Sequence, residues 1–378
     1  MRMNRLPRSR ADARGFSLVE LMVGLFVSLI GTLVMFQAFA LLEGQKRTTT
    51  SGSDAQQNGA YALVELERRI RSAGSGLVQG RNYGAWACRI TAYGGGAQRL
   101  PSAGNPAPFS AWPGTFRALP VLALDGGANP DSLAVVGGNP AVRVFGAAVG
   151  AVPGGGSVVL ANTVGIYGGD FLLGTGKTQP TCTLARAAAV DSATRQVTLA
   201  AADSPANSFV GAFNGQGYLF DLGSAPVLSL FGIDPAAQNL VEYDLLQRAG
   251  NGAMQGIAEG IVQLKVRYGV DDGAGGGSID DNVVDEWVVP AGPVWGRDAL
   301  SDGSAGALLA MARIKAVRVA LVARSALPER DYTGPATVTL FPDLAGALRV
   351  DVAVQTQYRH KVFDTTVPIH NTAIATYF

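Results

Sequence analysis

A run of 22 uncharged, mostly apolar residues, from Leu21 to Leu42, constrains this chain more than any other feature. As a helix rising 1.5 Å per residue, the run would be about 33 Å long, enough to cross a hydrocarbon core of roughly 30 Å. Five arginines and one aspartate lie within residues 1–15, and such short basic flanks stay on the cytoplasmic side of a membrane. The sequence therefore predicts one membrane crossing, with the rest of the chain exported.

An acid, Glu20, stands at the start of this run. A carboxylate in the apolar zone costs roughly 2.5 to 3.5 kcal/mol on insertion scales, so a cationic partner is expected. Cleavage between Gly15 and Phe16 would create one, because the new α-amine would lie one helical turn from Glu20, and the acid could pair with that amine or with a neighbouring copy's. A cleavable secretory signal fits poorly, since its apolar core has only roughly 7 to 15 residues.

The stretch RGFSLVE, residues 14–20, resembles the type III signal of type IV prepilins. This resemblance implies that a prepilin peptidase cuts after Gly15 and methylates the new N-terminal Phe16, so that residues 1–15 are a leader peptide. It also implies that Glu20 pairs with the amine of an adjacent subunit during assembly. Many major pilins have a proline midway along this helix, and the run here has none.

A second helical segment is predicted at about 54–73, where apolar residues recur at intervals of three and four. These residues are Leu63, Leu66, Ile70 and Ala73. The polar stretch 48–54 before them is expected to bend or fray the chain, or to end in an N-cap at Asp54. Gly74 and Gly76 are expected to stop the helix.

Residues 77–378 are predicted to form a β-rich head with long glycine- and proline-rich loops. Alternation of apolar and polar residues predicts antiparallel strands at 261–270, 314–325 and 348–357. In the first of these strands, one solvated face is predicted, formed by Gln263, Lys265 and Arg267.

Residues 58–76, NGAYALVELERRIRSAGSG, resemble the post-helix signature of PilW-type minor pilins of the type IV pilus. The strands towards the C-terminus resemble the same proteins and, less closely, the J-type minor pseudopilins of type II secretion. The implied fold is α+β and type IV pilin-like: a long N-terminal membrane-spanning helix packed against a mainly antiparallel β-sheet head. Within the helix, 16–76, the transmembrane part is 16–42. Between 77 and 260 the sequence resembles nothing specific.

The resemblance implies a minor pilin that enters the pilus after processing by the prepilin peptidase and helps to prime assembly in a tip complex. Its implied partners are other minor pilins, the major pilin and a tip adhesin. The chain would lie in the bacterial inner membrane with a periplasmic head, and at the cell surface after assembly, where adhesion and twitching motility are the associated activities. Two alternatives remain open: a J-type minor pseudopilin of type II secretion, and a pilus-borne adhesin module.

Other function classes are disfavoured by composition. A formal net charge of +1 provides no basic field for nucleic acid. His360 and His370 are the only histidines, and no catalytic motif accompanies them, so an enzyme is not predicted. Cys88 and Cys182 lack metal-site spacing; in an oxidising compartment they could form a disulfide, and otherwise they are two buried thiols.

A glycine-rich loop between two predicted strands carries five aspartates: Asp271, Asp272, Asp280, Asp281 and Asp285. Calcium prefers 6–8 oxygen ligands on a flexible turn, and this composition could supply them. The spacing does not match an EF-hand, however, so a solvated hairpin loop is the alternative. No other cofactor is predicted.

Overall fold

The computed structural model describes residues 17–142, 145–154, 156–176, 180–203, 217–248, 254–329 and 332–375. It divides into two compact units, Met1–Ser51 and Gly52–Phe378. The predicted leader, residues 1–15, and Phe16 lie outside the described residues. The second unit includes the last part of the N-terminal helix as well as all the strands.

Helix α1 extends from Leu18 to Arg71. The polar stretch 48–54 is helical, so the interpretation of Asp54 as an N-cap is wrong. Extending an existing helix fixes one residue per hydrogen bond, whereas starting a new one fixes several, so a few polar residues do not interrupt it. Gly74 and Gly76 follow the helix end with φ angles of 74° and 79°, the left-handed conformation that favours glycine.

The second unit contains two antiparallel sheets, a hairpin and a barrel-forming sheet. The five-stranded sheet has the order β13-β12-β11-β4-β3, and the four-stranded sheet has the order β15-β14-β16-β19. Strands of the first are β3 (Val121–Leu124), β4 (Ser132–Gly137), β11 (Val227–Asp234), β12 (Asn239–Asp244) and β13 (Gln255–Glu259). Strands of the second are β14 (Ile261–Val270), β15 (Glu286–Val288), β16 (Ile314–Arg324) and β19 (His360–Pro368).

The hairpin and the short helices complete the C-terminal half. The hairpin consists of β17 (Thr337–Leu340) and β18 (Val350–Ala353), and it follows β16 in the chain. The helices are α2 (Gly292–Trp295), α3 (Arg297–Leu300), α4 (Ala305–Arg313) and α5 (His370–Ala375), with 3-10 turns at Ala274–Gly276 and Gly346–Leu348. The strands predicted at 261–270 and 314–325 are found as β14 and β16, whereas only Val350–Ala353 of the strand predicted at 348–357 is found, as β18.

Residues between β4 and β11 form a closed barrel that the sequence did not reveal. An eight-stranded sheet has the order β2-β1-β8-β7-β10-β5-β6-β9, and β8 also pairs with β9, so the last six strands form a ring. Its strands are β1 (Arg89–Gly94), β2 (Ala97–Leu100), β5 (Ala147–Gly154), β6 (Ser157–Leu160), β7 (Phe171–Gly176), β8 (Thr181–Asp191), β9 (Gln196–Leu199) and β10 (Gly217–Asp221). Apolar side chains such as Val158, Leu172, Val197 and Leu219 fill the ring, which therefore has its own core.

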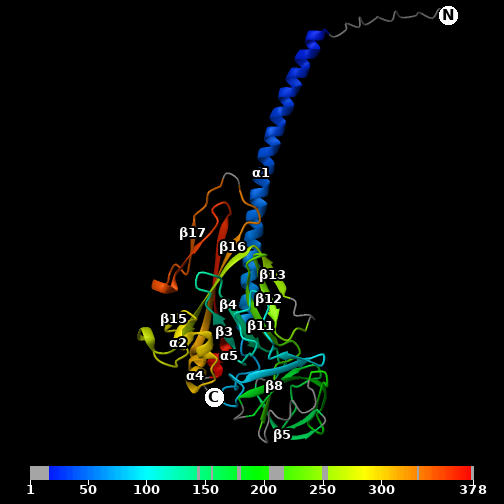
Figure 1. Ribbon diagram of the computed structural model, residues 1–378, viewed down its shortest axis with the longest axis vertical. Coiled ribbons are helices and arrows are strands. Elements are labelled where there is room, and N and C mark those ends of the chain that lie inside the picture. Colours follow the sequence, from blue (N-terminus) through cyan, green and yellow to red (C-terminus); the bar gives the residue numbers. More distant parts are fainter. Residues whose placement is uncertain are drawn as a thin grey trace, which may run out of the picture. The chain divides into compact units, whose positions relative to one another are not determined.

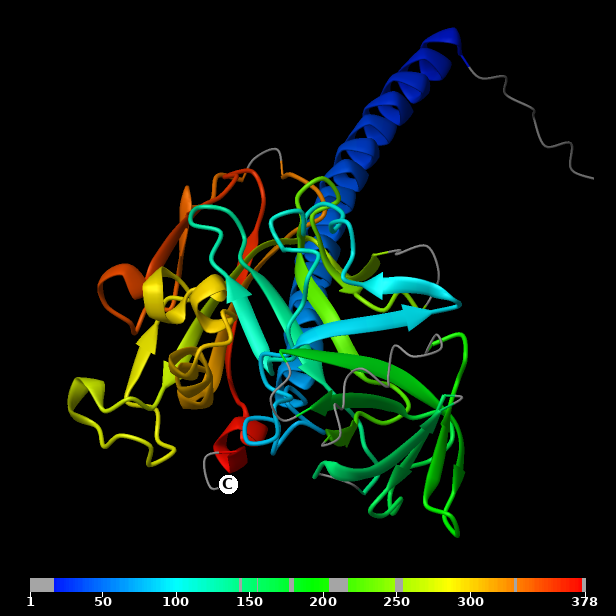
Figure 2. The same ribbon diagram turned by 60° about the horizontal axis from the view of Figure 1, so that its bottom comes forward.

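The barrel is an insertion in the five-stranded sheet, because β4 and β11 are neighbours there although the barrel strands lie between them in sequence. Figures 1 and 2 show the barrel, which includes β5 and β8, on one side of β3, β4 and β11, with the yellow-to-red C-terminal sheet on the other side. The fold is thus α+β, as expected, but it is larger than a helix packed on one sheet.

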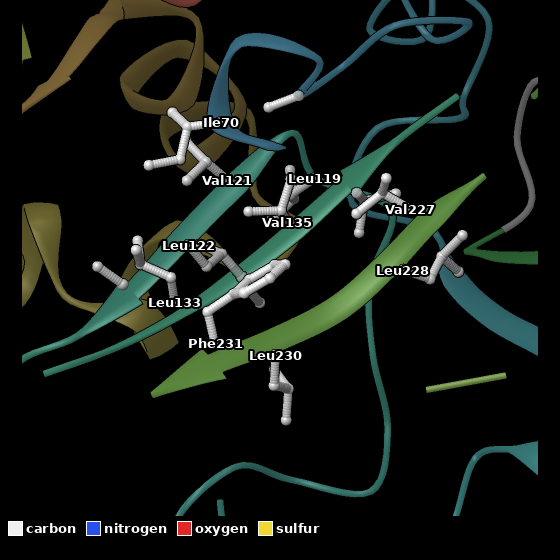
Figure 3. Close-up of a cluster of buried hydrophobic side chains, with 14 of the residues drawn as sticks. Ile70, Leu119, Val121, Leu122, Leu133, Val135, Val227, Leu228, Leu230 and Phe231 are labelled. Atoms are coloured by element: carbon white, nitrogen blue, oxygen red, sulfur yellow. The ribbon is translucent and has the colours of Figure 1, made fainter. Parts of the chain in front are cut away.

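The main core lies between the last turns of α1 and the strands. Leu66 and Ile70 are fully buried, and Figure 3 shows Ile70 next to Val121, in a cluster that also includes Val135 and Phe231 from the neighbouring strands. The predicted apolar stripe of the helix therefore faces the sheet. The rest of this core is continuous with β14 and β16.

Gly59 lies where α1 comes close to Phe363 of the C-terminal sheet. A Cβ atom at this position would overlap the ring of Phe363 in β19. Since only glycine lacks a Cβ, packing against Phe363 explains why a glycine follows Asn58 in the sequence signature.

The prediction of a solvated face on β14 is wrong. Gln263, Lys265 and Arg267 are only 4%, 1% and 2% exposed. The Lys265 ammonium donates to the carbonyls of Gly127 and Asn129 and to the Asp131 carboxylate, 2.7 to 2.8 Å away. The Arg267 guanidinium donates to the Leu348 carbonyl and lies over the ring of Phe341. Alternation predicted the strand correctly, but not the polypeptide that covers its polar face.

Candidate functional site

The apolar part of α1 is the first candidate site. Residues Leu18–Ala40 have a mean hydropathy of 2.3, and none of this segment is buried against the rest of the chain. A core helix of a soluble domain would be covered by its own protein, whereas Leu21, Phe26 and Leu33 are all more than half exposed. At 1.5 Å per residue, 23 residues extend about 34 Å, which is the length of a membrane crossing.

The two hydroxyl groups within this segment are hydrogen-bonded inside the helix. Ser28 donates its hydroxyl to the carbonyl of Gly24 at 2.6 Å, and Thr32 donates to that of Leu29 at 2.9 Å. Such local bonds leave no hydroxyl to be desolvated when the helix lies in lipid. Beyond the backbone of its own helix, a Cβ atom at Gly24 or Gly31 would meet no described atom within 4 Å, so the packing of the described residues requires neither glycine. Small residues of this kind allow close approach of a second helix.

Glu20 also caps the start of α1. Its carboxylate accepts the backbone N–H of Ser17 at 3.0 Å, while the Ser17 hydroxyl accepts the N–H of Val19 at 3.3 Å. This reciprocal arrangement is similar to a capping box, except that the hydroxyl accepts from the second helical residue rather than the third, and it satisfies the N–H groups of Ser17 and Val19. The sequence reasoning missed it, although the Ser-x-x-Glu spacing was available as a signal. The acid therefore has a local partner within the described residues.

The predicted cleavage residues cannot be compared with the structure, since Gly15 and Phe16 lie outside the described residues. Their position in the sequence is informative all the same. An amine on Phe16 would be one residue before Ser17, whose N–H the Glu20 carboxylate already accepts.

Cys88 and Cys182 are joined by a disulfide with Cα atoms 5.6 Å apart. Both residues are buried. The bond lies where β1 and β8 pair in parallel, with Ile90 opposite Cys182. It therefore ties a barrel strand to the segment that follows α1.

The acidic loop brings three of its five predicted candidates together. One carboxylate oxygen from each of Asp271, Asp281 and Asp285 lies within 4.8 Å of the others. Asp272 instead accepts the N–H of Ala274, and Asp280 pairs with a guanidinium outside the loop.

The three carboxylates of this group already hold the loop. Asp271 accepts the N–H groups of Asp281 and Asn282, and Asp285 accepts that of Gly273. The Lys315 ammonium lies 3.7 Å from Asp271, and burial lowers the pKa of this lysine. Three carboxylates could supply part of the oxygen ligands that a calcium ion needs. The Lys315 ammonium beside them would compete with such an ion for their negative charge. Calcium binding stays a prediction, and the loop is explained without it.

Two family comparisons bear on the chain. Residues 10–36 match the prokaryotic N-terminal methylation motif, and residues 233–371 match the family described as type IV pilus-assembly protein W. No curated protein and no solved structure matches the chain. The first match covers the candidate cleavage residues, Glu20 and much of the exposed apolar helix. The second begins at the end of β11 and reaches into α5, so the closed barrel lies outside it.

Proposed function

We propose that this PilW-type, prepilin-like protein is a minor pilin of the type IV pilus, which joins other pilus subunits through α1 after its leader has been removed. One observation carries the proposal. An apolar helix of 23 residues, with none of its length buried by its own chain, follows a processing motif and precedes a PilW-type region.

The helix has two successive environments in this proposal. Before assembly, Leu18–Ala40 lies in the inner membrane, where its length matches the hydrocarbon core and its hydroxyls are already bonded. During assembly, the same surface packs against helices of other subunits. Gly24 and Gly31, where an added Cβ would meet nothing within 4 Å among the described residues, are the positions where a neighbouring helix comes closest.

The role of Glu20 follows from the capping geometry. In the uncut chain the carboxylate is held by the N–H of Ser17. After cleavage, the positively charged amine of Phe16 adds a stronger, charge-assisted partner, from the same chain or from a neighbour. Because an unpaired acid is costly in lipid, the pair favours one axial position of the helix in the growing filament.

The head supplies the subunit-specific contacts. Its partners in the proposal are other minor pilins, the major pilin and a tip adhesin, in a complex that primes assembly at the periplasmic side of the inner membrane. The disulfide accords with this location, since disulfides persist in oxidising compartments. The assembly family is structural, and the role proposed here requires no catalysis. The match of residues 233–371 favours the pilus over a secretion pseudopilin.

The processing step is tested by substituting Gly15 with Leu in cells that contain the prepilin peptidase. The full-length precursor should accumulate in the membrane and be missing from sheared pili. Gly52→Ala is the matched control, because a Cβ at this helical glycine meets nothing within 4 Å. Efficient removal of residues 1–15 from the Gly15→Leu variant would refute the proposed cleavage position.

The role of Glu20 is tested by comparing Glu20→Gln with Glu20→Val. A glutamine retains the oxygen that accepts the Ser17 N–H but loses the charge, whereas a valine loses both. If pairing with an amine is required, both variants should insert into the membrane and both should lower the number of pili per cell. Normal piliation with Gln but not with Val would reduce Glu20 to a helix cap and overturn the pairing.

A further inference from the structure

A cleft of about 430 Å³ lies beside strand β18, on the side away from β17. Its lining includes the six consecutive residues Val350 to Gln355 and no residue of β17. The facing wall comes from the loop 128–130 and from Val262 and Gln263 at the start of β14. Pockets of roughly 300 to 1,000 Å³ are the usual size for bound ligands.

Among the described residues, β18 has no partner strand on this side. Val354 donates its N–H to Ala336 at 2.9 Å, which makes these two residues a hydrogen-bonded pair. The next pair, Thr337 with Ala353, is then a non-hydrogen-bonded one, whose N–H and C=O groups point away from the partner strand. Ala353 and, two residues earlier, Asp351 therefore direct their backbone groups towards the cleft. Such an edge is a template for another strand.

An apolar surface lies next to this edge. Ala320 and Val322 of β16 are fully buried in the cluster formed with the hairpin. Val262 in the neighbouring strand β14 packs on the same cluster but stays partly exposed. The hairpin thus covers β16 and, through its turn, Arg267 of β14, but it leaves Val262 at the start of β14 partly exposed. A third strand beside β18 would cover Val262 and complete the layer.

One end of the cleft carries an uncompensated positive charge. Arg324 donates to the neutral amide of Gln355 at 2.9 Å and stacks on Tyr358, and within the described part of the chain it has no carboxylate partner. Its Nε atom and the Nδ1 atom of His360 are buried without a hydrogen-bond partner. Burial is the main cause that lowers the pKa of His360, and the positive charge of the nearby Arg324 is the second. The imidazole is therefore neutral at pH 7, and the guanidinium sets the charge at this end.

The acid in the cleft lining does not neutralise this charge. The Asp351 carboxylate accepts the Thr339 hydroxyl at 2.5 Å and lies 3.8 Å from the Arg349 guanidinium. Both partners belong to the hairpin region rather than to the end where Arg324 lies.

We propose that the cleft binds an extended segment of a partner protein, which pairs with the free edge of β18 as a third strand. An apolar side chain of this segment packs on Val262, and a carboxylate reaches Arg324. A free anion would need only the guanidinium, whereas the unpaired backbone and the apolar wall fit a peptide. The inference does not depend on assembly in a pilus, because the cleft belongs to the head alone.

The test uses the full-length chain in detergent and a positional-scanning library of fluorescent pentapeptides with blocked ends. Selected peptides should carry Asp or Glu at one end and β-branched residues at alternate positions. Replacing that acid by its amide should weaken binding by about tenfold or more, the value of a charge-assisted hydrogen bond. Methylating the backbone nitrogen that faces β18 should abolish binding.

Two pairs of protein variants locate the contact. Ala353→Pro removes the N–H that points into the cleft and should abolish binding, while Thr337→Pro removes the equivalent N–H on the opposite edge of the hairpin and should not. Arg324→Gln should erase the preference for the acidic peptide, while Arg349→Gln should retain it.

Three results would overturn the proposal: no selected peptide at millimolar concentration, indifference to backbone methylation, or complete displacement of the peptide by glutarate alone. The methylated peptide tests strand pairing even if a proline variant does not fold.

Discussion

The disulfide permits the most quantitative test of the head. It joins residues 94 positions apart. In the chain-entropy model, a loop of this length removes about 16 cal/mol/K from the unfolded chain, or about 4.7 kcal/mol of stabilisation at 25 °C. Replacing Cys88 and Cys182 together with Ala should therefore lower the free energy of unfolding by about 4 to 6 kcal/mol, the upper end including the small cavities that two buried side chains leave.

Guanidinium unfolding of the full-length chain in detergent measures this loss, with tryptophan fluorescence as the signal. Trp86 lies two residues from Cys88, is 4% exposed and donates its indole N–H to the Leu77 carbonyl, so its emission reports local unfolding. The wild-type protein refolded under reducing conditions is the matched control, because it lacks the bond but keeps both sulfur atoms. It should lose about 4.7 kcal/mol without the cavity contribution.

Oxidised and reduced proteins that unfold within about 1 kcal/mol of each other would refute this reasoning. A second expectation concerns the barrel, which has its own core and is tied to β1 through Cys182. Without the bond, amide exchange should increase in β8 more than in β16.

Two further predictions concern packing in the head. Gly59→Val places side-chain atoms where the ring of Phe363 lies, so it should destabilise the head by about 1 to 3 kcal/mol, as overpacking does. Adding Phe363→Ala should restore part of this stability. Gly52→Ala is the control, because its Cβ meets nothing within 4 Å, and it should change the free energy of unfolding little in the same denaturation measurement. Lys265→Met should lower the free energy of unfolding by about 3 to 5 kcal/mol, because it leaves the carboxylate of Asp131 buried without a cation. Adding Asp131→Asn should recover part of this loss. An unchanged unfolding midpoint in the single variant would contradict the account.

The N-terminal helix and the C-terminal strands were predictable because their signals are local. An uninterrupted apolar run defines the helix from Leu21 onwards without reference to the rest of the chain. Alternation likewise defines β14, β16 and β18. Glu20 was recognised from its unfavourable position, whereas its capping bond to Ser17 was overlooked in favour of a partner outside the chain.

The polar face of β14 shows what local patterns cannot predict. Lys265 and Arg267 look like solvent-facing residues at alternate positions, and only tertiary structure brings the carbonyls of the β3–β4 loop and the ring of Phe341 over them. The barrel was missed for a similar reason. Four of its six strands, β6, β7, β9 and β10, have only four to six residues, and closure depends on β8 pairing with both β7 and β9.

The acidic loop was predicted only in part. Its composition suggested a cation, and Asp271, Asp281 and Asp285 do converge. Sequence alone could not show that the Lys315 ammonium lies beside them, or that backbone N–H groups occupy their oxygens.

The central claim is that cleavage before Phe16 produces the form of the chain that assembles. Intact-mass analysis of this protein, purified from sheared type IV pili of the native bacterium, tests the claim directly. The account predicts a chain that begins at Phe16 and carries one methyl group on its terminal amine. A protein in assembled pili that still retains residues 1–15 would contradict it.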